Sequence, residues 1–206
     1  MSDSNKVKFG LKNAYYALGT IANDGTATYG TPVHIPGSVS ISLSPEGELS
    51  PFYADNVVYW QGGGNSGYSG NYECAKIPDQ FWVDVFNSIR DNNGVLIENA
   101  DSEPNMIALL FQMEGDKKAR RHVLYNVTPT RPEASASTHT DNKEPITDSM
   151  PITCKTIYNE ALDINTPKAS VEQGDPAYAT WFDAVYQTTA TAAPAAPTEQ
   201  TQEPGQ

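Results

Sequence analysis

Residues 37–77 read GSVSISLSPEGELSPFYADNVVYWQGGGNSGYSGNYECAKI, and this segment is the most informative part of the chain. Val39, Ile41 and Leu43 alternate with serine, which is typical of a strand with one buried face. The chain then returns through a second strand that carries Tyr68, Tyr72 and Cys74. Two such strands, one after the other, favour an antiparallel sheet.

The segment between these strands, residues 45–66, is long for an inter-strand loop and is rich in aromatic side chains. Long excursions in small domains are commonly used for binding. The aromatic residues are Phe52, Tyr53, Tyr59 and Trp60. Such residues are common at protein interfaces, but they also cover a domain's own core, and the sequence leaves both interpretations open.

The chain of 206 residues is long enough for one domain with a substantial core, which we assign to residues 1–187. We expect a polar loop at 132–145 and a disordered tail at 188–206, because that tail is mostly Ala, Pro, Thr and Gln. Thirteen basic against 25 acidic residues give a formal net charge of −12. A protein this acidic is a poor candidate for gripping nucleic acid, and an acidic surface would repel passing DNA.

The sequence contains no apolar run long enough to span a membrane and no features of a secretion signal near its first residue. We therefore expect no membrane partner. Cys74 and Cys154 each fall within a predicted strand, and we expect both to be buried, reduced thiols rather than a disulfide.

Outside residues 37–77, the spacing of apolar residues also predicts mainly strands. Further strands are predicted at 7–17, 26–35, 106–114, 120–130 and 146–158. The segments 106–114 and 120–130 give the strongest hairpin signal. In that hairpin Ile107, Leu109, Phe111 and Met113 are expected to share one face, and Val123, Tyr125 and Val127 one face of the partner strand.

Two helices are predicted. The first covers 79–91, with Asp79 as N-cap, an apolar stripe from Phe81 to Ile89, and Asn92-Asn93-Gly94 as the stop. The second covers 176–186, with Asp175 as N-cap and an apolar stripe formed by Tyr178, Trp181, Phe182 and Val185. The expected fold is therefore mainly β, a sandwich or barrel of antiparallel sheets with one flanking helix and a short C-terminal helix.

The motifs give little support for catalysis. The three histidines are scattered, and we find no nucleophile elbow, P-loop or dinucleotide fingerprint. Gly62-Gly63-Gly64 lacks the helix and the Lys-Ser/Thr pair of a phosphate site. We expect no enzyme, no cofactor and no metal.

A basic cluster stands out in this acidic chain. Its members are Lys117, Lys118, Arg120 and Arg121. One interpretation is a solvated hairpin tip that keeps two apolar strands soluble. Another is a positive knob that meets an acidic patch on a neighbouring copy and sets its orientation. A nucleic-acid site is the weakest option against the surrounding negative charge.

The predicted sheet has edges that the chain has few means to cover, since it has only two short helices. Uncovered edges pair with other chains. Head-to-tail pairing of edges closes a ring where the rotation permits. These edges favour homo-oligomerisation.

Five segments together resemble the major tail proteins of long-tailed bacteriophages, in the phi13-like group from Gram-positive hosts. The segments are NKVKFGLKNAYYA (5–17), YGTPVHIPGSVSISLSPEGELSPFYADNVVYW (29–60), IPDQFWVDV (77–85), ALLFQMEGDKKARRHVLYNVTPTRP (108–132) and AYATWFDAVY (177–186). The resemblance covers about residues 5–187, and EGDKKARRHVLYN and PFYADN are its most specific pieces.

This resemblance implies a virion protein that assembles in the host cytoplasm into six-membered rings, stacked as a tail tube through which DNA passes without specific binding. The implied partners are other copies of itself, a tape measure protein in the lumen, and terminator and baseplate or distal tail proteins at the ends. Six copies would build a barrel of roughly two dozen strands, wider than a porin.

Under this hypothesis the aromatic residues Phe52, Tyr53, Tyr59 and Trp60 would contact the next ring. The candidates for acidic residues in the lumen are Glu46, Glu48, Asp55 and Glu73. The alternative is a carbohydrate-binding β-sandwich of a phage or cell-surface protein, in which Tyr53, Tyr59, Trp60 and Tyr68 would stack on sugar rings.

Overall fold

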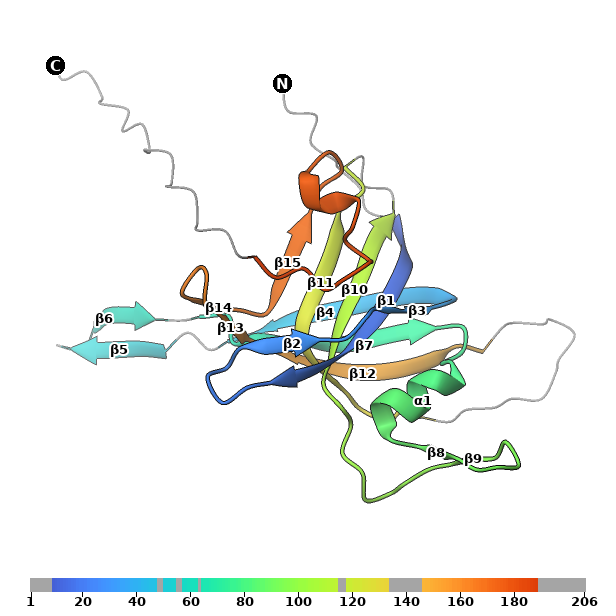
Figure 1. Ribbon diagram of the computed structural model, residues 1–206. Coiled ribbons are helices and arrows are strands. Elements are labelled where there is room, and N and C mark those ends of the chain that lie inside the picture. The colour runs from blue at the N-terminus through green and yellow to red at the C-terminus, as the bar shows by residue number, and fades with distance from the viewer. Residues whose placement is uncertain are drawn as a thin grey trace, which may run out of the picture.

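The protein is mainly β, with one large antiparallel sheet and one α-helix (Figure 1). The computed structural model describes residues 9–47, 50–54, 57–62, 64–114, 118–133 and 146–188. Within these ranges no helix is long and apolar enough to cross a membrane.

The main sheet has the order β2-β1-β10-β11-β12-β7-β4, with β3 also pairing with β1 and β15 with β11. Its strands are β1 (Phe9–Ile21), β2 (Ala27–Tyr29), β3 (Val33–Ile35), β4 (Ser38–Glu46), β7 (Gly67–Cys74), β10 (Ile107–Glu114), β11 (Arg121–Pro129), β12 (Asp148–Lys155) and β15 (Lys168–Val171). The two-stranded sheets are β5 (Ser50–Ala54) with β6 (Val57–Gly62), β8 (Ile89–Arg90) with β9 (Leu96–Ile97), and β13 (Ile157–Asn159) with β14 (Ile164–Thr166).

Two hydrophobic cores lie on opposite faces of β10. Its residues alternate between them: Ile107, Leu109 and Phe111 belong to the first core, and Ala108 and Leu110 to the second. The first core also takes in the apolar side chains of β7, β12 and α1 (Asp79–Phe86). The second is covered by the C-terminal segment that includes η1 (Pro176–Tyr178). Because both faces of β10 are covered, its sequence is an almost continuous apolar run.

The predicted hairpin of β10 and β11 is confirmed, but the predicted face of Val127 is wrong. Ile107 lies opposite Val127 whereas Leu109 lies opposite Leu124, so β11 contains one extra residue between these pairs. Such a bulge reverses which side chains point to each face. Val123 and Tyr125 therefore pack in the second core, while Val127 packs in the first.

The strand predicted over 26–35 consists of two short strands. β2 pairs with Gly19–Ile21 of β1 and β3 pairs with Ala14–Tyr16, so both use the same edge of β1. Pro32 lies between them, and because proline has no backbone N–H it interrupts a strand.

The first predicted helix forms but is shorter than predicted. α1 ends at Phe86 because Asn87 adopts a left-handed conformation with φ 55°, which closes the helix. Ile89 belongs to β8, and Asn92-Asn93-Gly94 lies in the turn between β8 and β9 instead of stopping a helix. Asp79 is not the N-cap: Pro78 holds that position, and the Asp79 carboxylate pairs with Arg90 at 2.9 Å.

The second predicted helix is wrong. After the single turn of η1, residues 179–188 form turns and irregular chain. The backbone bonds here join residues three apart, as in turns: Trp181 N–H donates to the Tyr178 carbonyl at 3.4 Å and Asp183 N–H to the Thr180 carbonyl at 3.0 Å. The Tyr178 carbonyl also accepts a hydrogen bond from Arg121. The side chains named for its apolar stripe nevertheless pack on the second core: Tyr178, Trp181, Phe182 and Val185. Asp175 precedes η1 without a side-chain cap.

Candidate functional site

The long excursion between β4 and β7 is a hairpin of β5 and β6, where the sequence predicted a loop. Phe52 lies opposite Trp60, and the register shifts between Phe52 and Tyr53. Figure 1 shows this hairpin projecting from the side of the molecule, away from both cores. The side chains of Phe52, Tyr53, Tyr59 and Trp60 lie outside the described residues, so their role in ring-to-ring contact stays a prediction.

β4, β7 and β12 form an antiparallel part of the main sheet with one apolar and one polar face. Residues directly opposite each other in such a sheet share a face, so the register assigns the side chains. Tyr72, Met150 and Ile152 point into the first core, and Ile41 and Leu43 pack against it. The opposite face carries Ser40, Ser42, Ser44 and Glu46 from β4, Ser69, Asn71 and Glu73 from β7, and Ser149, Pro151, Thr153 and Lys155 from β12.

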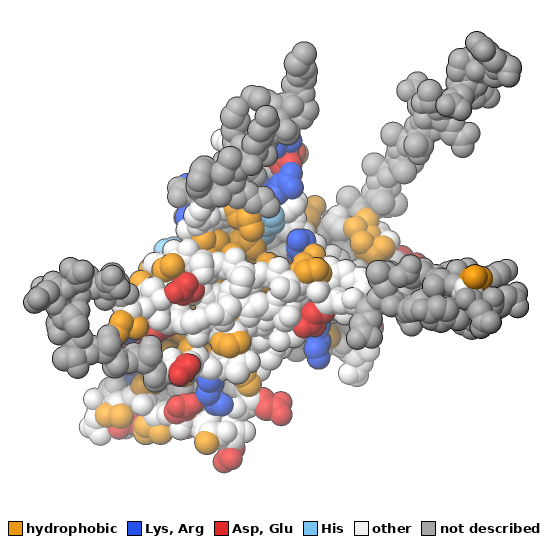
Figure 2. Space-filling view, turned by 180° about the vertical axis from the view of Figure 1, so that it is seen from behind, with side chains coloured by type: hydrophobic (Ala, Val, Ile, Leu, Met, Phe, Trp, Pro, Cys, Tyr) orange, Lys and Arg blue, Asp and Glu red, His pale blue; other side chains and the backbone are white. Residues whose placement is uncertain are grey.

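The sheet extends this polar face onto the end of β11, where Thr128 lies opposite Thr153. The side chains on the face are mostly short hydroxyls and amides, and its charged members are Glu46, Glu73 and Lys155. β4 passes behind the other strands in Figure 1, and the view from behind shows a broad area of uncharged polar side chains and backbone across the middle of the molecule (Figure 2). By the register, the described members of this face are polar apart from Pro151, so the face is suited to contact with water.

β4 is the terminal strand in the hydrogen-bonded order of the sheet, and in the described part of the chain it is hydrogen-bonded to β7 alone, although it also lies close to β1. A register shift at Ser38–Ser40 places Val39 in a bulge, where its side chain is exposed. The sequence prediction that Val39 faces the core with Ile41 and Leu43 is therefore wrong. Residues of an antiparallel strand point their backbone groups alternately to its two sides, so half of those on β4 face away from β7.

Glu73 is the best-ordered carboxylate on the polar face. Ser40 Oγ donates a hydrogen bond to Glu73 Oε2 at 2.8 Å, and Thr147 Oγ1 donates to Oε1. These two hydroxyl donors, Thr147 first, lower the pKa of Glu73 because they stabilise the charged form. Glu73 is therefore a fixed negative charge at neutral pH.

Two of the four predicted lumen carboxylates, Glu46 and Glu73, share this face. The other two, Glu48 and Asp55, lie outside the described residues. Two of the four predicted carboxylates thus lie on one face of the sheet, and the positions of the other two stay a prediction.

The basic cluster makes contacts within its own chain. Lys118 and Arg120 both form ion pairs with Glu172, which follows β15. The two cations lower the pKa of Glu172 through hydrogen bonds, that from Lys118 first. Lys117 lies outside the described residues. The predicted contact between subunits stays a prediction, and the structure adds an internal role that neither sequence interpretation included.

Arg121 fastens the C-terminal segment to the sheet. Its guanidinium carbon lies 3.8 Å from the centre of the Tyr178 ring and 4.7 Å from that of Phe182. Phe182 in turn stacks on Tyr15 with centroids 4.8 Å apart, and Tyr125 Oη donates to the Tyr186 carbonyl at 2.8 Å. This segment closes the second core, so Arg121 is a packing residue as well as a charge.

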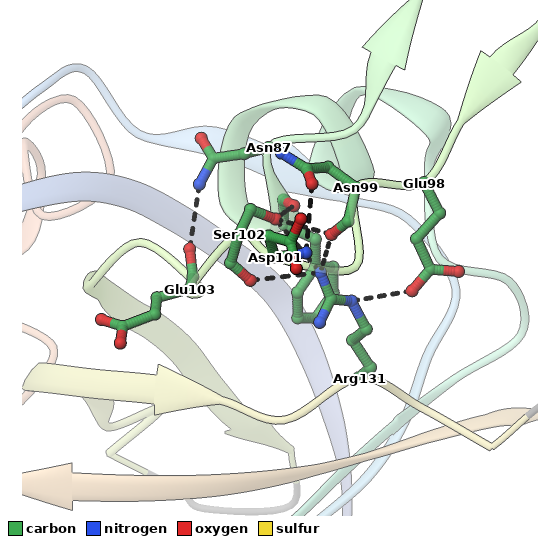
Figure 3. A network of polar contacts seen from close by, with 8 residues as sticks. Asn87, Glu98, Asn99, Asp101, Ser102, Glu103 and Arg131 are labelled. Atoms are coloured by element: carbon green, nitrogen blue, oxygen red, sulfur yellow. Dashed lines mark hydrogen bonds and ion pairs between the residues drawn. The ribbon is translucent and has the colours of Figure 1, made fainter.

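Arg131, which sequence reasoning missed, organises the chain after α1 (Figure 3). Its Nη2 donates to the carbonyls of Asn99 at 2.7 Å and Ser102 at 3.3 Å, and its Nε lies 2.8 Å from Glu98 Oε1. Asn87 adds a bond from its amide to the Glu103 carbonyl at 2.9 Å. No local signal identifies Arg131, because its partners are about thirty residues earlier in the chain.

The described residues offer no obvious catalytic centre. A cleft of about 460 Å³ lies between β2 and β13, and its lining includes Thr26, Tyr158, Glu160 and Gln187 but no histidine or cysteine. In these same ranges no group of three or more His, Cys, Asp or Glu side chains is arranged to hold a metal. Cys74 and Cys154 are free and buried, as predicted, and burial raises the pKa of each thiol to about 11. Both thiols are therefore unreactive at neutral pH.

No protein-family model matches the sequence, and no curated protein matches it significantly.

Proposed function

We propose that this protein is a structural subunit that assembles with copies of itself into stacked rings, forming the tube of a phage tail through which DNA passes. The observation that carries the proposal is the sheet of β4, β7 and β12, which has an uncovered polar face, an unpaired edge at β4, and an extension beyond the body as the β5–β6 hairpin. Each of these three features would have a use in a tube.

The unpaired edge is the first support. An exposed strand offers its free backbone N–H and C=O groups to another chain, and a closed barrel removes all such edges. β4 lies close to β1 but is not hydrogen-bonded to it, so the backbone groups of β4 that face away from β7 would be available to a neighbouring copy. If each copy contributed β4, β7, β12 and the end of β11, six copies would give roughly two dozen strands, and the barrel would be wider than porin barrels of 16 to 18 strands.

The polar face is the second support. A bore for DNA must be wetted without binding phosphates, which requires few lysines and arginines. The short serine and threonine side chains on this face hold water without projecting far, and the negative charges of Glu46 and Glu73 outnumber the positive charge of Lys155. We therefore propose that this face lines the lumen. It would contact the tape measure protein first and the DNA afterwards.

The β5–β6 hairpin is the third support. It continues the direction of β4 and β7 past the end of the sheet, so it would reach a neighbouring ring while β4 and β7 stay in their own. No observation favours the carbohydrate-binding alternative. Tyr68, one of the proposed sugar platforms, packs against the first core, and the Lys168 ammonium lies 4.7 Å from its ring centre.

The decisive experiment is electron microscopy of the concentrated full-length protein, combined with analytical ultracentrifugation. We expect hexameric rings or hollow tubes. A protein that remains monomeric at millimolar concentration, with and without extracts containing the other tail proteins, would overturn the proposal.

A variant of the β4 edge makes this test specific. Val39→Lys adds a charge to the exposed bulge without removing a core residue, and lysine on an edge strand opposes pairing. We expect the variant to keep its monomer stability and to lose rings. Val39→Thr is the conservative control, and Ile164→Lys places the same charge on an exposed residue of β14. Equal loss of rings in Ile164→Lys would show a general charge effect instead of edge pairing.

A further inference from the structure

The short hairpin of β8 and β9 follows α1 and stands out from the body at the lower right of Figure 1. Its strands have two residues each, which is too short for a stable hairpin in isolation. The hairpin therefore needs support from elsewhere in the chain, and the structure supplies it.

Polar contacts fix both ends of this hairpin. Arg90 pairs with Asp79 at 2.9 Å, which holds β8 against the start of α1. Asp91 Oδ1 accepts hydrogen bonds from the backbone N–H groups of Asn93 at 2.9 Å and Val95 at 2.8 Å, which sets the turn. After β9, Arg131 holds residues 98–102 as shown in Figure 3. The hairpin is thus preorganised, although it adds little to either core.

The β8–β9 hairpin displays apolar side chains that are exposed to solvent. Ile89 is 59% exposed, Val95 54% and Ile97 48%, and none of them belongs to either core. Ile89 lies directly opposite Ile97, so these two side chains share one face of the hairpin. An ordered element that displays adjacent exposed aliphatic residues is characteristic of a protein interface.

We propose that the β8–β9 hairpin is the receiving surface for the β5–β6 hairpin of a second copy of this chain. The two hairpins lie at opposite ends of the molecule, one projecting at the left of Figure 1 and the other at the lower right. Val57 of β6 is also exposed, so each end displays an aliphatic side chain that a head-to-tail contact would bury.

A contact between two different surfaces at opposite ends repeats from copy to copy and does not close on itself as a two-fold dimer does. That is the geometry which stacking requires. This inference rests on the proposed tube function and specifies which surfaces meet between successive rings.

Disulfide trapping between two differently labelled proteins tests this contact. One preparation carries Val57→Cys and the other Val95→Cys; they are mixed under assembly conditions at pH 8 with mild oxidant. The native thiols do not compete, because Cys74 and Cys154 are buried and the pKa of each is raised to about 11. We expect a mixed disulfide dimer in at least tenfold excess over the one formed with Ile164→Cys, which is similarly exposed but lies near the β5–β6 end.

A second measurement separates this inference from the tube proposal. The double variant Ile89→Ser with Ile97→Ser should still form rings but not stack them, with its far-ultraviolet circular dichroism unchanged. If the wild type forms tubes and the double variant forms them equally well, or if Val57→Cys couples to Ile164→Cys as readily as to Val95→Cys, the inference is overturned while the tube proposal stands. If the wild type forms no rings, the tube proposal itself fails.

Discussion

β10 and β4 are strands of similar length in one sheet, yet β10 is covered on both faces whereas β4 is covered on one. In β10 the residues from Ile107 to Phe111 are all apolar and all buried. In β4 the apolar residues Ile41 and Leu43 face the core, and serines occupy the other side. The two strands therefore have different roles. The half of the sheet around β10 stabilises the fold through burial on both faces. The half around β4 has one uncovered face that contacts water or a partner.

The largest expected effect is a difference in unfolding free energy between substitutions in these two halves of the sheet. Leu110→Ala leaves a cavity in the second core, and we expect a loss of about 2–5 kcal/mol in the free energy of unfolding. Ser42→Ala on the polar face should change that free energy by less than about 0.5 kcal/mol. Urea denaturation of both variants measures the contrast. A loss above about 2 kcal/mol for Ser42→Ala would show that the polar face is packed within the monomer.

A substitution in β7 tests how closely β4 is held. A Cβ on Gly70 would lie 1.8 Å from the Ser42 carbonyl oxygen, so Gly70→Ala must push β4 away from β7. We expect a loss of about 1–3 kcal/mol, as for overpacked sites, and a larger loss of assembly than Leu110→Ala causes at equal stability. Gly64→Ala is the matched control, because a Cβ there meets nothing within 4 Å. Similar unfolding curves for the two glycine variants would contradict this account.

Substitutions in the contact between Arg121 and the C-terminal segment, which covers the second core, should change the free energy of unfolding by a smaller amount. Arg121→Lys keeps the charge but loses the planar contact with Tyr178 and Phe182, and we expect a loss of about 1 kcal/mol. Arg90→Lys, in an exposed ion pair, should cost less than about 0.5 kcal/mol. Thermal unfolding of both variants gives the comparison. Limited proteolysis near residue 180 should also be faster in Arg121→Lys alone.

The smallest effect concerns the pH dependence of the polar face. The pKa of Glu73 is lowered by its hydroxyl donors, so its contribution to stability is present above the usual glutamate pKa of about 4.3 and is lost as the pH falls through the lowered value. We expect Thr147→Val to raise the pKa of Glu73 toward the usual value, as measured by carboxyl NMR titration. A titration curve unchanged by Thr147→Val would show that the Thr147 bond does not form in solution.

Much of the sheet could be predicted from sequence, because strands covered on one or both faces leave a clear pattern of side chains. The alternation in β4 and β12 and the apolar run in β10 are of this kind. The bulges at Val39 and between Leu124 and Val127 could not be predicted, because one extra residue reverses the faces without changing the composition.

The helix predicted at 176–186 failed for a different reason. Its apolar side chains do pack on the second core, Trp181 fully and the others in part. The backbone nevertheless forms turns, and Arg121 of β11 holds it through the Tyr178 carbonyl and the rings of Tyr178 and Phe182. The pairing of Lys118 and Arg120 with Glu172 was missed for the same reason. Contacts between residues more than fifty positions apart override local propensity, and a single sequence carries no record of them.

The continuous path from β4 through the β5–β6 hairpin to β7 has a mechanical consequence. If successive copies are joined through that hairpin, tension along the stack pulls β4 and β7 lengthwise. The ladder from Asp148 to Lys155 that joins β12 to β7 would then be loaded in shear, with its hydrogen bonds sharing the force instead of opening one at a time. Such a filament would resist stretching along its axis while bending at the junctions between copies.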